Sequence, residues 1–469
     1  MRSENLPIDV LLAGLGLAWA GLIGALVWPV PALHAPLQFF MYLLAFSAAI
    51  LVLSPRYRAL VVSPLFLLGL LSCLFFTIPP WVWTHISIES MLATAPDRTA
   101  AIRRFVDGTG QLVVQQFSAL ALLTSLALAR FRPTGRPAAT SPMPVIDLGA
   151  HSAKFAAGAI VAILGGAVFI ACQYFPAAGG WWGGGRAGLQ LLFAAGPLIA
   201  IGVVTLIALA IGRPPGWTVL AAVGLAVGCA ALLLTFAAKL SVFLALASLA
   251  YFVAHRRLPR RGLVVACAGV AVILVIVLTV LTVMRYGTPY GRGVGMLASW
   301  TLQGKLLLRQ ADTGGCFQSA AEQALPHGNS ESPFYFVAVF VPRLLWRDKP
   351  GFSHGNDYAR AYCGFEPDAR HSASITLLGQ PVVRAGWAGL AVAEATLIVG
   401  LSAVTLLADR RRPAGPIALA ALLPWLIDFD QDFALYVGNA VKMFLWMLPL
   451  LIPMVVIASR ADSARAGKK

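Results

Sequence analysis

The sequence predicts an all-α polytopic membrane protein, and three observations support this fold class. Hydrophobic residues make up 59% of the chain and charged residues only 12%, against roughly 25% charged residues in an average soluble domain. The apolar runs are about 17–25 residues long, which is the length of a helix that crosses a bilayer. They lack the period-two alternation of a membrane β-barrel, the other fold that satisfies every backbone hydrogen bond within lipid.

Hydropathy along the chain separates about twelve transmembrane helices. Residues 217–255, interrupted by Lys239, and residues 415–459, interrupted by an acidic run, are each longer than one crossing. Both are therefore predicted to be helical hairpins. The predicted spans are residues 9–30, 37–54, 60–80, 112–130, 153–174, 188–212, 217–237, 239–255, 262–284, 386–408, 415–429 and 434–459.

The positions of the basic residues predict the orientation of the chain. A net charge of +16 could indicate a nucleic-acid partner, but more than half of the 35 Lys and Arg residues fall in loops on one side of the alternating spans. The positive-inside rule places those loops and both termini in the cytoplasm, so no nucleic-acid partner is expected. The chain then divides into helices one to nine (1–284), a large loop on the non-cytoplasmic side (285–385) and helices ten to twelve (386–469).

Charged residues inside or at the ends of spans need partners, because lipid solvates them poorly. Glu394 and Lys442 lie in the tenth and twelfth predicted spans and could form an ion pair that joins two helices. The acidic run Asp428, Asp430 and Asp432 lies at the outside end of the last hairpin. It could balance nearby arginines or supply a base, and we expect it near a functional site.

The large loop has three recognisable parts. Residues 296–310 have the spacing of an amphipathic helix, which would lie at the membrane interface or pack on the rest of the loop. Pro333–Trp346 is apolar but short and contains a proline, so it suits a re-entrant or interfacial segment better than a crossing. Residues 351–376 are polar and aromatic and are predicted to bind a polar substrate. Cys316 and Cys363 are a candidate disulfide if this side is oxidising.

Basic residues outnumber acidic residues in this loop, although orientation signals avoid the non-cytoplasmic side. Arginine binds phosphate oxygens through two parallel hydrogen bonds. A cation cluster at this depth is therefore predicted to hold a lipid-linked diphosphate, while any single arginine could instead form an ion pair within the loop. The basic residues are Arg285, Arg292, Lys305, Arg309, Arg343, Arg347, Lys349, Arg360, Arg370 and Arg384.

Two stretches in and after the loop carry a recognisable pattern. Val341–Pro350 reads VPRLLWRDKP, and Ser374–Gly389 reads SITLLGQPVVRAGWAG. They resemble motifs of the oligosaccharide repeat-unit polymerases of bacterial O-antigen and exopolysaccharide synthesis (the Wzy type), which often carry Pro-Arg, two apolar residues and Trp-Pro-x-Lys-Pro in a large periplasmic loop. The sequence departs from that pattern at Arg347, where the family usually has Pro, and at Gln380, where an acidic residue is common.

The resemblance implies a GT-C-like glycosyltransferase of the bacterial inner membrane. It would transfer a growing glycan from its polyprenyl diphosphate to the next lipid-linked repeat unit in the periplasm, with the bilayer, a chain-length regulator and a flippase as partners. Cations must stabilise the leaving diphosphate, and a base must accept the proton of the acceptor hydroxyl. If arginines supply the charge, this chemistry needs no metal and no cofactor.

The loop supplies candidates for each of these roles. The bases considered are Asp348, Asp357, His354 and His371, and the sequence does not rank them. The sugar-stacking aromatics considered are Tyr335, Trp346, Tyr358 and Tyr362. The residues predicted to be catalytic are Arg343, Arg384, Asp348 and His354. Those predicted to bind substrate are Arg292, Arg347, Lys349, Trp346, Asp357, Tyr358, Arg360 and His371.

Three other functions are compatible with parts of the sequence. An O-antigen ligase would use the same donor with a lipid A-core acceptor, and its loop has a similar charge pattern. A lipid-linked oligosaccharide flippase or other transporter would place charges at the bilayer midplane, whereas here they gather in one external loop. A structural membrane subunit would not require this concentration of arginine, histidine and carboxylate.

Overall fold

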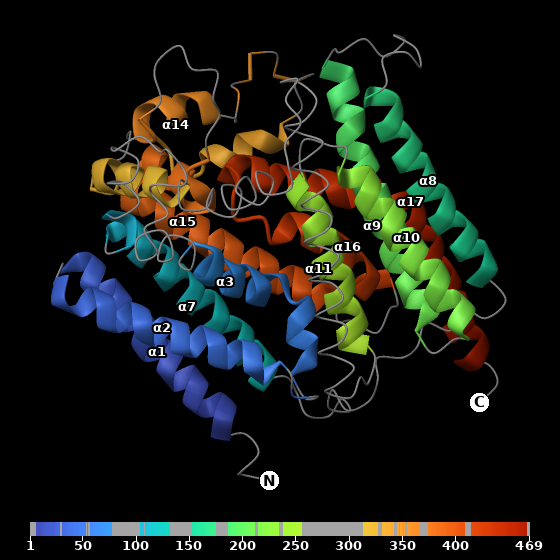
Figure 1. Ribbon diagram of the computed structural model, residues 1–469, viewed down its shortest axis with the longest axis horizontal. Coiled ribbons are helices and arrows are strands. Elements are labelled where there is room, and N and C mark those ends of the chain that lie inside the picture. Colours follow the sequence, from blue (N-terminus) through green and yellow to red (C-terminus); the bar gives the residue numbers. More distant parts are fainter. Residues whose placement is uncertain are drawn as a thin grey trace, which may run out of the picture.

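The computed structural model describes most of the chain, and every regular element in the described residues is a helix (Figure 1). The described residues are 6–28, 31–52, 54, 57–76, 104–106, 108–131, 152–174, 186–211, 214–233, 238–255, 313–326, 331–341, 345–346, 348–349, 351, 354–364, 374–408 and 414–466. Their elements are α1 (Leu6–Val27), α2 (Pro31–Leu51), η2 (Arg58–Val62), α3 (Pro64–Phe75), α7 (Thr109–Arg130), α8 (Ser152–Tyr174), α9 (Arg186–Ala210), α10 (Pro215–Leu233), α11 (Ala238–His255), η6 (Tyr335–Phe340), α14 (Gly355–Tyr362), α15 (Thr376–Ala408), α16 (Ala414–Leu426) and α17 (Phe433–Ala466). Residues 313–324 are also helical.

The chain is an α-helical membrane protein. Within the described residues, seven helices are long and apolar enough to cross a bilayer, namely α1, α2, α7, α8, α10, α15 and α17. Shorter apolar helices occur in α3, α9, α11 and α16. Each predicted span except the ninth overlaps one of these helices. The ninth span, 262–284, and the amphipathic stretch 296–310 lie outside the described residues, so the total of twelve crossings stays a prediction.

Both predicted hairpins are pairs of helices. The apolar stretch 217–255 consists of α10 and α11, and Lys239 lies in the first turn of α11. The stretch 415–459 consists of α16 and α17, which are separated by residues 427–432 with the acidic run. Hydropathy alone joins these helices, and the polar residues between them mark the turns.

Contacts between helix ends agree with the predicted alternation of spans. At one end of the bundle, Arg130 at the end of α7 forms an ion pair of 2.9 Å with Asp9 in the first turn of α1. At the other end, the Gln38 amide near the start of α2 donates to the Val106 carbonyl at 2.6 Å. Both chain termini lie at the bottom of Figure 1, and α14 lies at the top. The assignment of the lower end to the cytoplasm stays a prediction.

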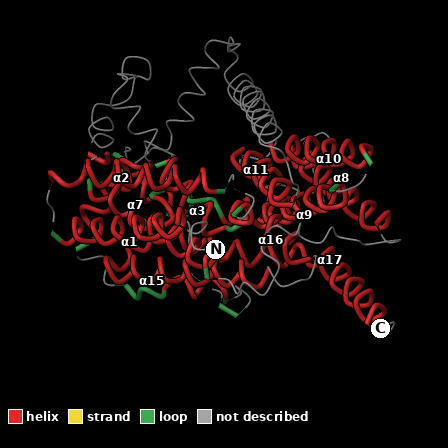
Figure 2. The backbone as a smooth tube through the Cα atoms, turned by 90° about the horizontal axis from the view of Figure 1, so that it is seen from below, coloured by secondary structure: helices red, strands yellow, loops and turns green. Residues whose placement is uncertain are grey.

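The helices form two apolar clusters that share α7. Helices α1, α2 and α3 pack on α7 in the first cluster, and α8 to α11 and α15 to α17 form most of the second. In Figure 2, α1, α2, α3 and α7 lie on the left with α15 beneath them, and α8 to α11, α16 and α17 lie on the right. In the apolar 18-residue stretch of α7, 67% of the residues are buried inside the protein, against 22–33% in the corresponding stretches of the other six long helices. Helix α7 is therefore the central helix of the described bundle.

The central position of α7 explains its polar residues. Gln111, Gln115 and Gln116 are each exposed by 1% or less, so they face protein instead of lipid. The Gln116 amide donates to the carboxylate of Glu394 on α15. The predicted ion pair between Glu394 and Lys442 is wrong, because Lys442 lies exposed on α17 and the carboxylate is bound from α7 instead.

Helix α15 is broken between Arg384 and the apolar part that follows. Ala385 has φ −141° and ψ 20°, and Gly386 has φ 56° and ψ −135°, a left-handed value that favours glycine. The break falls where the sequence predicts the tenth span to begin. Beyond it, a Cβ atom at Gly389 would lie 2.1 Å from the Pro381 carbonyl oxygen. Glycine is required there because the segment before the break folds closely against the segment after it.

The candidate disulfide is formed and attaches α14 to the helix of residues 313–324. Cys316, in the helix of residues 313–324, is bonded to Cys363, the residue that ends α14. In the same helix the side-chain oxygen of Gln318 accepts a hydrogen bond of 2.7 Å from the backbone N–H of Gly110 at the start of α7. The disulfide therefore connects α14 to the central helix of the bundle.

Gly389→Ala is expected to lower the thermal stability of the protein in detergent by about 1–3 kcal/mol, the usual cost of overpacking. The matched control is Gly400→Ala on the same helix, where a Cβ atom meets nothing within 4 Å and where alanine favours the helix. Thermal melting measures both. Equal melting temperatures for the two variants would contradict the close packing across the break in α15.

Cys316→Ser/Cys363→Ser is expected to destabilise the protein by about 4 kcal/mol, because a cross-link between residues 47 apart restricts the unfolded chain. Dithiothreitol should lower the melting temperature of the unmodified protein and leave that of the double variant unchanged. Titration of thiols under denaturing conditions without reductant gives an independent check. Reaction of both Cys316 and Cys363 in that titration would show that the bond is absent.

Candidate functional site

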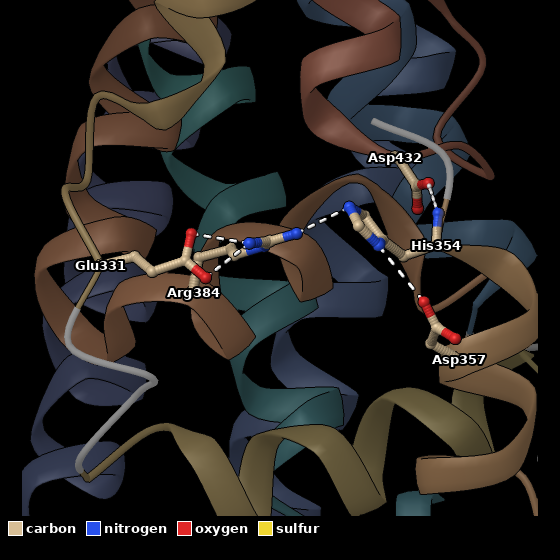
Figure 3. Close-up of polar contacts among 5 residues, drawn as sticks. All are labelled: Glu331, His354, Asp357, Arg384 and Asp432. Carbon is tan, nitrogen blue, oxygen red and sulfur yellow. Dashed lines mark hydrogen bonds and ion pairs between the residues drawn. The ribbon is translucent and has the colours of Figure 1, made fainter. Parts of the chain in front are cut away.

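A cluster of polar side chains lies at the end of the bundle that carries α14 (Figures 1 and 3). Four parts of the chain meet there: residues 331–341 with η6, the start of α14, the first segment of α15, and the turn 427–432 before α17. Glu331, Arg384 and His354 lie in a row, with Asp357 and Asp432 on the far side of the histidine. Residues far apart in the sequence thus form one site.

Arg384 lies at the centre of this row. Its Nη1 atom donates to both carboxylate oxygens of Glu331, at 2.5 and 2.6 Å, and its Nη2 atom lies 2.6 Å from Nε2 of His354. The guanidinium carbon also lies 5.8 Å from the centre of the Tyr335 ring. With its side chain 22% exposed, Arg384 is held in one orientation and still reaches the surface of the site.

The contacts of His354 define which ring nitrogen carries the proton. A guanidinium can only donate, so Nε2 of His354 accepts from Arg384. In the neutral ring the proton then resides on Nδ1, which lies 3.3 Å from the Asp357 carboxylate. The backbone N–H of His354 donates to Asp432 at 3.4 Å. The carboxylate of Asp357 thus orients the ring, and the carboxylate of Asp432 holds the backbone at the start of α14.

Asp432 is the buried carboxylate of the site, with 6% of its surface exposed. Burial raises the pKa of its carboxyl group from 3.8 to about 6, because the charged form loses its hydration. The hydrogen bond from the His354 backbone and the positive charge of Arg384 act in the opposite direction. Asp432 therefore changes its charge near neutral pH, directly beside the histidine.

Gln380 connects three parts of the site. Its side-chain oxygen accepts one hydrogen bond from the Tyr335 hydroxyl at 3.0 Å and another from the backbone N–H of Ala434 at 2.9 Å. The residue is completely buried. A neutral amide can hold η6, α15 and the start of α17 together without placing a charge in this buried position. The departure from the family pattern at Gln380 thus has a structural role here.

The Tyr358 hydroxyl on α14 makes no hydrogen bond in the structure, although the residue is only 4% exposed. Burial raises the pKa of this hydroxyl, while the nearby Arg384 and Gln380 act to lower it. It therefore remains protonated and can donate. A buried donor without a partner costs about 1–3 kcal/mol, so Tyr358 is suited to an oxygen atom of a ligand that enters beside Arg384.

Other predicted site residues have different positions or roles. Nζ of Lys349 donates to the carbonyls of Val339 and Val341 at 2.8 and 2.7 Å, so two of its three protons stabilise the end of η6. Asp348, Trp346 and Arg360 are exposed. The predicted residues that lie outside the described part of the chain are Arg292, Arg343, Arg347 and His371.

Sequence patterns identified Arg384, His354, Asp357 and Tyr358, which the structure brings together. Glu331 was missed, because an isolated glutamate in a polar loop carries no local signal. Asp432 was expected near the site as part of an acidic run that could balance arginines or supply a base, but the sequence did not single it out from Asp428 and Asp430.

Chemically, the cluster combines the oriented cation of Arg384, a histidine whose Nε2 atom is a hydrogen-bond acceptor, and the buried hydroxyl donor of Tyr358. The cation and the hydroxyl can bind an anionic oxygen-rich group. The histidine can accept a proton once its contact with Arg384 is released. This set is suited to a transfer reaction with an anionic leaving group.

Asp432→Asn is expected to reduce the pH dependence of stability. Between about pH 4 and 6 the folded protein holds the Asp432 proton more tightly than the unfolded chain does, so stability falls as pH rises through this window. The loss, on the order of 3 kcal/mol, should be absent in the variant. Thermal melting at pH 4 and pH 7 measures it, and parallel pH profiles for both proteins would contradict the raised pKa.

No family model matches the chain, and neither does any curated protein or any solved structure. The function proposed below therefore rests on the motifs of the sequence and on the contacts of the described residues.

Proposed function

We propose that the protein is a polymerase that joins polyprenyl-diphosphate-linked oligosaccharide repeat units into a bacterial surface polysaccharide. The reaction would take place on the periplasmic side of the inner membrane, at the end of the bundle that carries α14. The observation that carries the proposal is the row Glu331, Arg384 and His354 at the end of an apolar helical bundle. It brings a cation and a base together at the end of the bundle, where the headgroup of a lipid-linked substrate would lie.

Arg384 is the group that would stabilise the leaving diphosphate. A guanidinium has five N–H donors, and Glu331 and His354 occupy only part of this capacity. Glu331 holds the fork in place, so little reorganisation is needed as negative charge develops on the diphosphate. The Tyr358 hydroxyl would add a neutral donor to the same oxygens.

His354 is the group that would accept the proton. In the transfer, the acceptor hydroxyl oxygen forms a bond to the anomeric carbon of the donor glycan, and the bond between that carbon and the diphosphate oxygen breaks. The hydroxyl proton passes to Nε2 of His354, and polyprenyl diphosphate leaves with the bonding electron pair. Asp357, on the other ring nitrogen, stabilises the imidazolium that results.

Binding of the diphosphate would also prepare the base. In the structure Nε2 of His354 accepts from Arg384 at 2.6 Å, so its lone pair is occupied. A diphosphate that draws Nη2 of Arg384 toward its own oxygens would release this lone pair. The histidine thus becomes basic only when a donor is bound, which limits unproductive proton transfer.

The alternatives predict different products in cells. In a host strain that lacks the gene, single repeat units on the surface lipid support a polymerase. Loss of all transferred glycan would instead indicate a ligase or a flippase. Accumulation of full-length polymer on the carrier lipid would specifically identify a ligase.

Arg384→Ala and His354→Asn are each expected to reduce polymerisation by on the order of 100-fold, because the charge on the diphosphate or the proton acceptor is lost. Glycan length in complemented deletion strains measures the effect, with protein levels compared by immunoblot. Arg130→Ala is the control, since it removes an ion-paired arginine from the opposite end of the bundle. Normal glycan length with Arg384→Ala would exclude the proposed mechanism.

A further inference from the structure

The short helix η6 packs on the bundle through one of its three sides. A 3₁₀-helix has three residues per turn, so residues three apart share a side. Phe336 and Val339 form the side that packs on α17. The Phe336 ring contacts the Phe433 ring edge to face, with 5.0 Å between centres. Val339 lies against Gly438, where a Cβ atom would be 2.8 Å from a Val339 methyl group. This close contact fixes the rotation of η6.

The second side of η6 belongs to the site described above. Tyr335 donates its hydroxyl proton to Gln380, and its ring lies beside the guanidinium of Arg384. Because the first side is fixed on α17, Tyr335 cannot turn away from Arg384. The position of the cation is thus tied to the position of η6.

The third side is apolar and exposed. Phe334, Val337 and Phe340 follow one another at intervals of three, and they are 58%, 51% and 47% exposed. On α17, Val441 and Leu445 are 43% and 54% exposed in the turns that follow Gly438. Since α17 is a candidate span, these exposed side chains of α17 would face lipid close to the contact between Gly438 and η6.

We propose that Phe334, Val337 and Phe340 hold the polyisoprenoid chain of the lipid-linked substrate. The inference deepens the proposed function, since it places the diphosphate of that substrate at Arg384. In a polyprenyl diphosphate the first isoprene units follow the charged group directly. A site for it therefore needs a cation and an apolar surface within the width of one helix. The η6 helix provides both, because Tyr335 contacts the cation and the adjacent side carries the apolar residues.

This arrangement also explains why an aromatic and apolar segment is attached to a polar site. Exposure of Phe334, Val337 and Phe340 to water would be unfavourable, because removing each of these side chains from water gains about 1.5–3 kcal/mol. Aromatic residues are enriched at the boundary between lipid and water. Trp346, shortly after η6, is also exposed by 39%. A chain held there would leave the glycan in the aqueous region near His354.

The test compares donors that differ only in chain length. Val337→Ser/Phe340→Ser in proteoliposomes should raise the KM for a long-chain polyprenyl diphosphate donor roughly tenfold. The KM for an analogue with a methyl group in place of the isoprenoid chain should stay unchanged, and kcat should stay unchanged for both. The control is Val161→Ser/Leu164→Ser on α8, whose side chains are 69% and 51% exposed. It should change neither constant.

A KM that rises equally for both donors, or that does not rise for the long-chain donor, would overturn the inference and leave the proposed function intact. Photo-crosslinking tests it without any turnover. A p-benzoylphenylalanine at position 337 should label radioactive polyprenyl diphosphate, and excess unlabelled polyprenyl diphosphate should compete. At position 161 the same probe should label bulk lipid without competition. Absence of competition at position 337, as at position 161, would mean that η6 contacts only bilayer lipid. Absence of polymer in all assays would refute the proposed function separately.

Discussion

The structure of the site depends on the break in α15. A helix that crosses lipid must satisfy its own backbone groups and present apolar side chains, whereas the site needs Gln380 and Arg384 in polar surroundings. The left-handed φ of Gly386 separates these requirements within one element. Before the break, the chain is held by hydrogen bonds to η6 and α17. After it, the chain packs as an apolar span, so the arginine is fixed at the boundary between the two environments.

The interior of the bundle accommodates polar residues within an apolar helix. Helix α7 carries three glutamines in an otherwise apolar run, and it is also the most buried of the long described helices. Because neighbouring helices surround it, the side-chain NH2 groups of these amides find acceptors in protein. Gln115 donates to the Tyr42 hydroxyl at 3.2 Å, and Gln116 donates to Glu394. A carboxylate within a span is tolerated because an amide from the central helix reaches it.

The ion pair between Arg384 and Glu331 both helps and opposes the proposed chemistry. It orients the guanidinium before substrate arrives, which lowers the reorganisation needed in the transition state. It also competes with the diphosphate for the same protons, so the substrate must offer better hydrogen bonds than one carboxylate does. The buried Asp432 adds a second negative group whose ionisation depends on pH near neutrality. Affinity for an anion at this site therefore reflects a balance of nearby charges.

The sequence by itself determined the fold class, most helix positions and the part of the chain that carries most of the polar cluster. Hydropathy reports local solvation, so it located the start of the apolar segment at Gly386, and the acidic run in the turn separated α16 from α17. Motifs selected Arg384 and His354. Only the tertiary structure decided which groups contact them, because Glu331 and Asp432 lie far away in the chain. For the same reason the expected pair of Glu394 and Lys442 was wrong: complementary charges within two spans reveal nothing about how those helices are rotated.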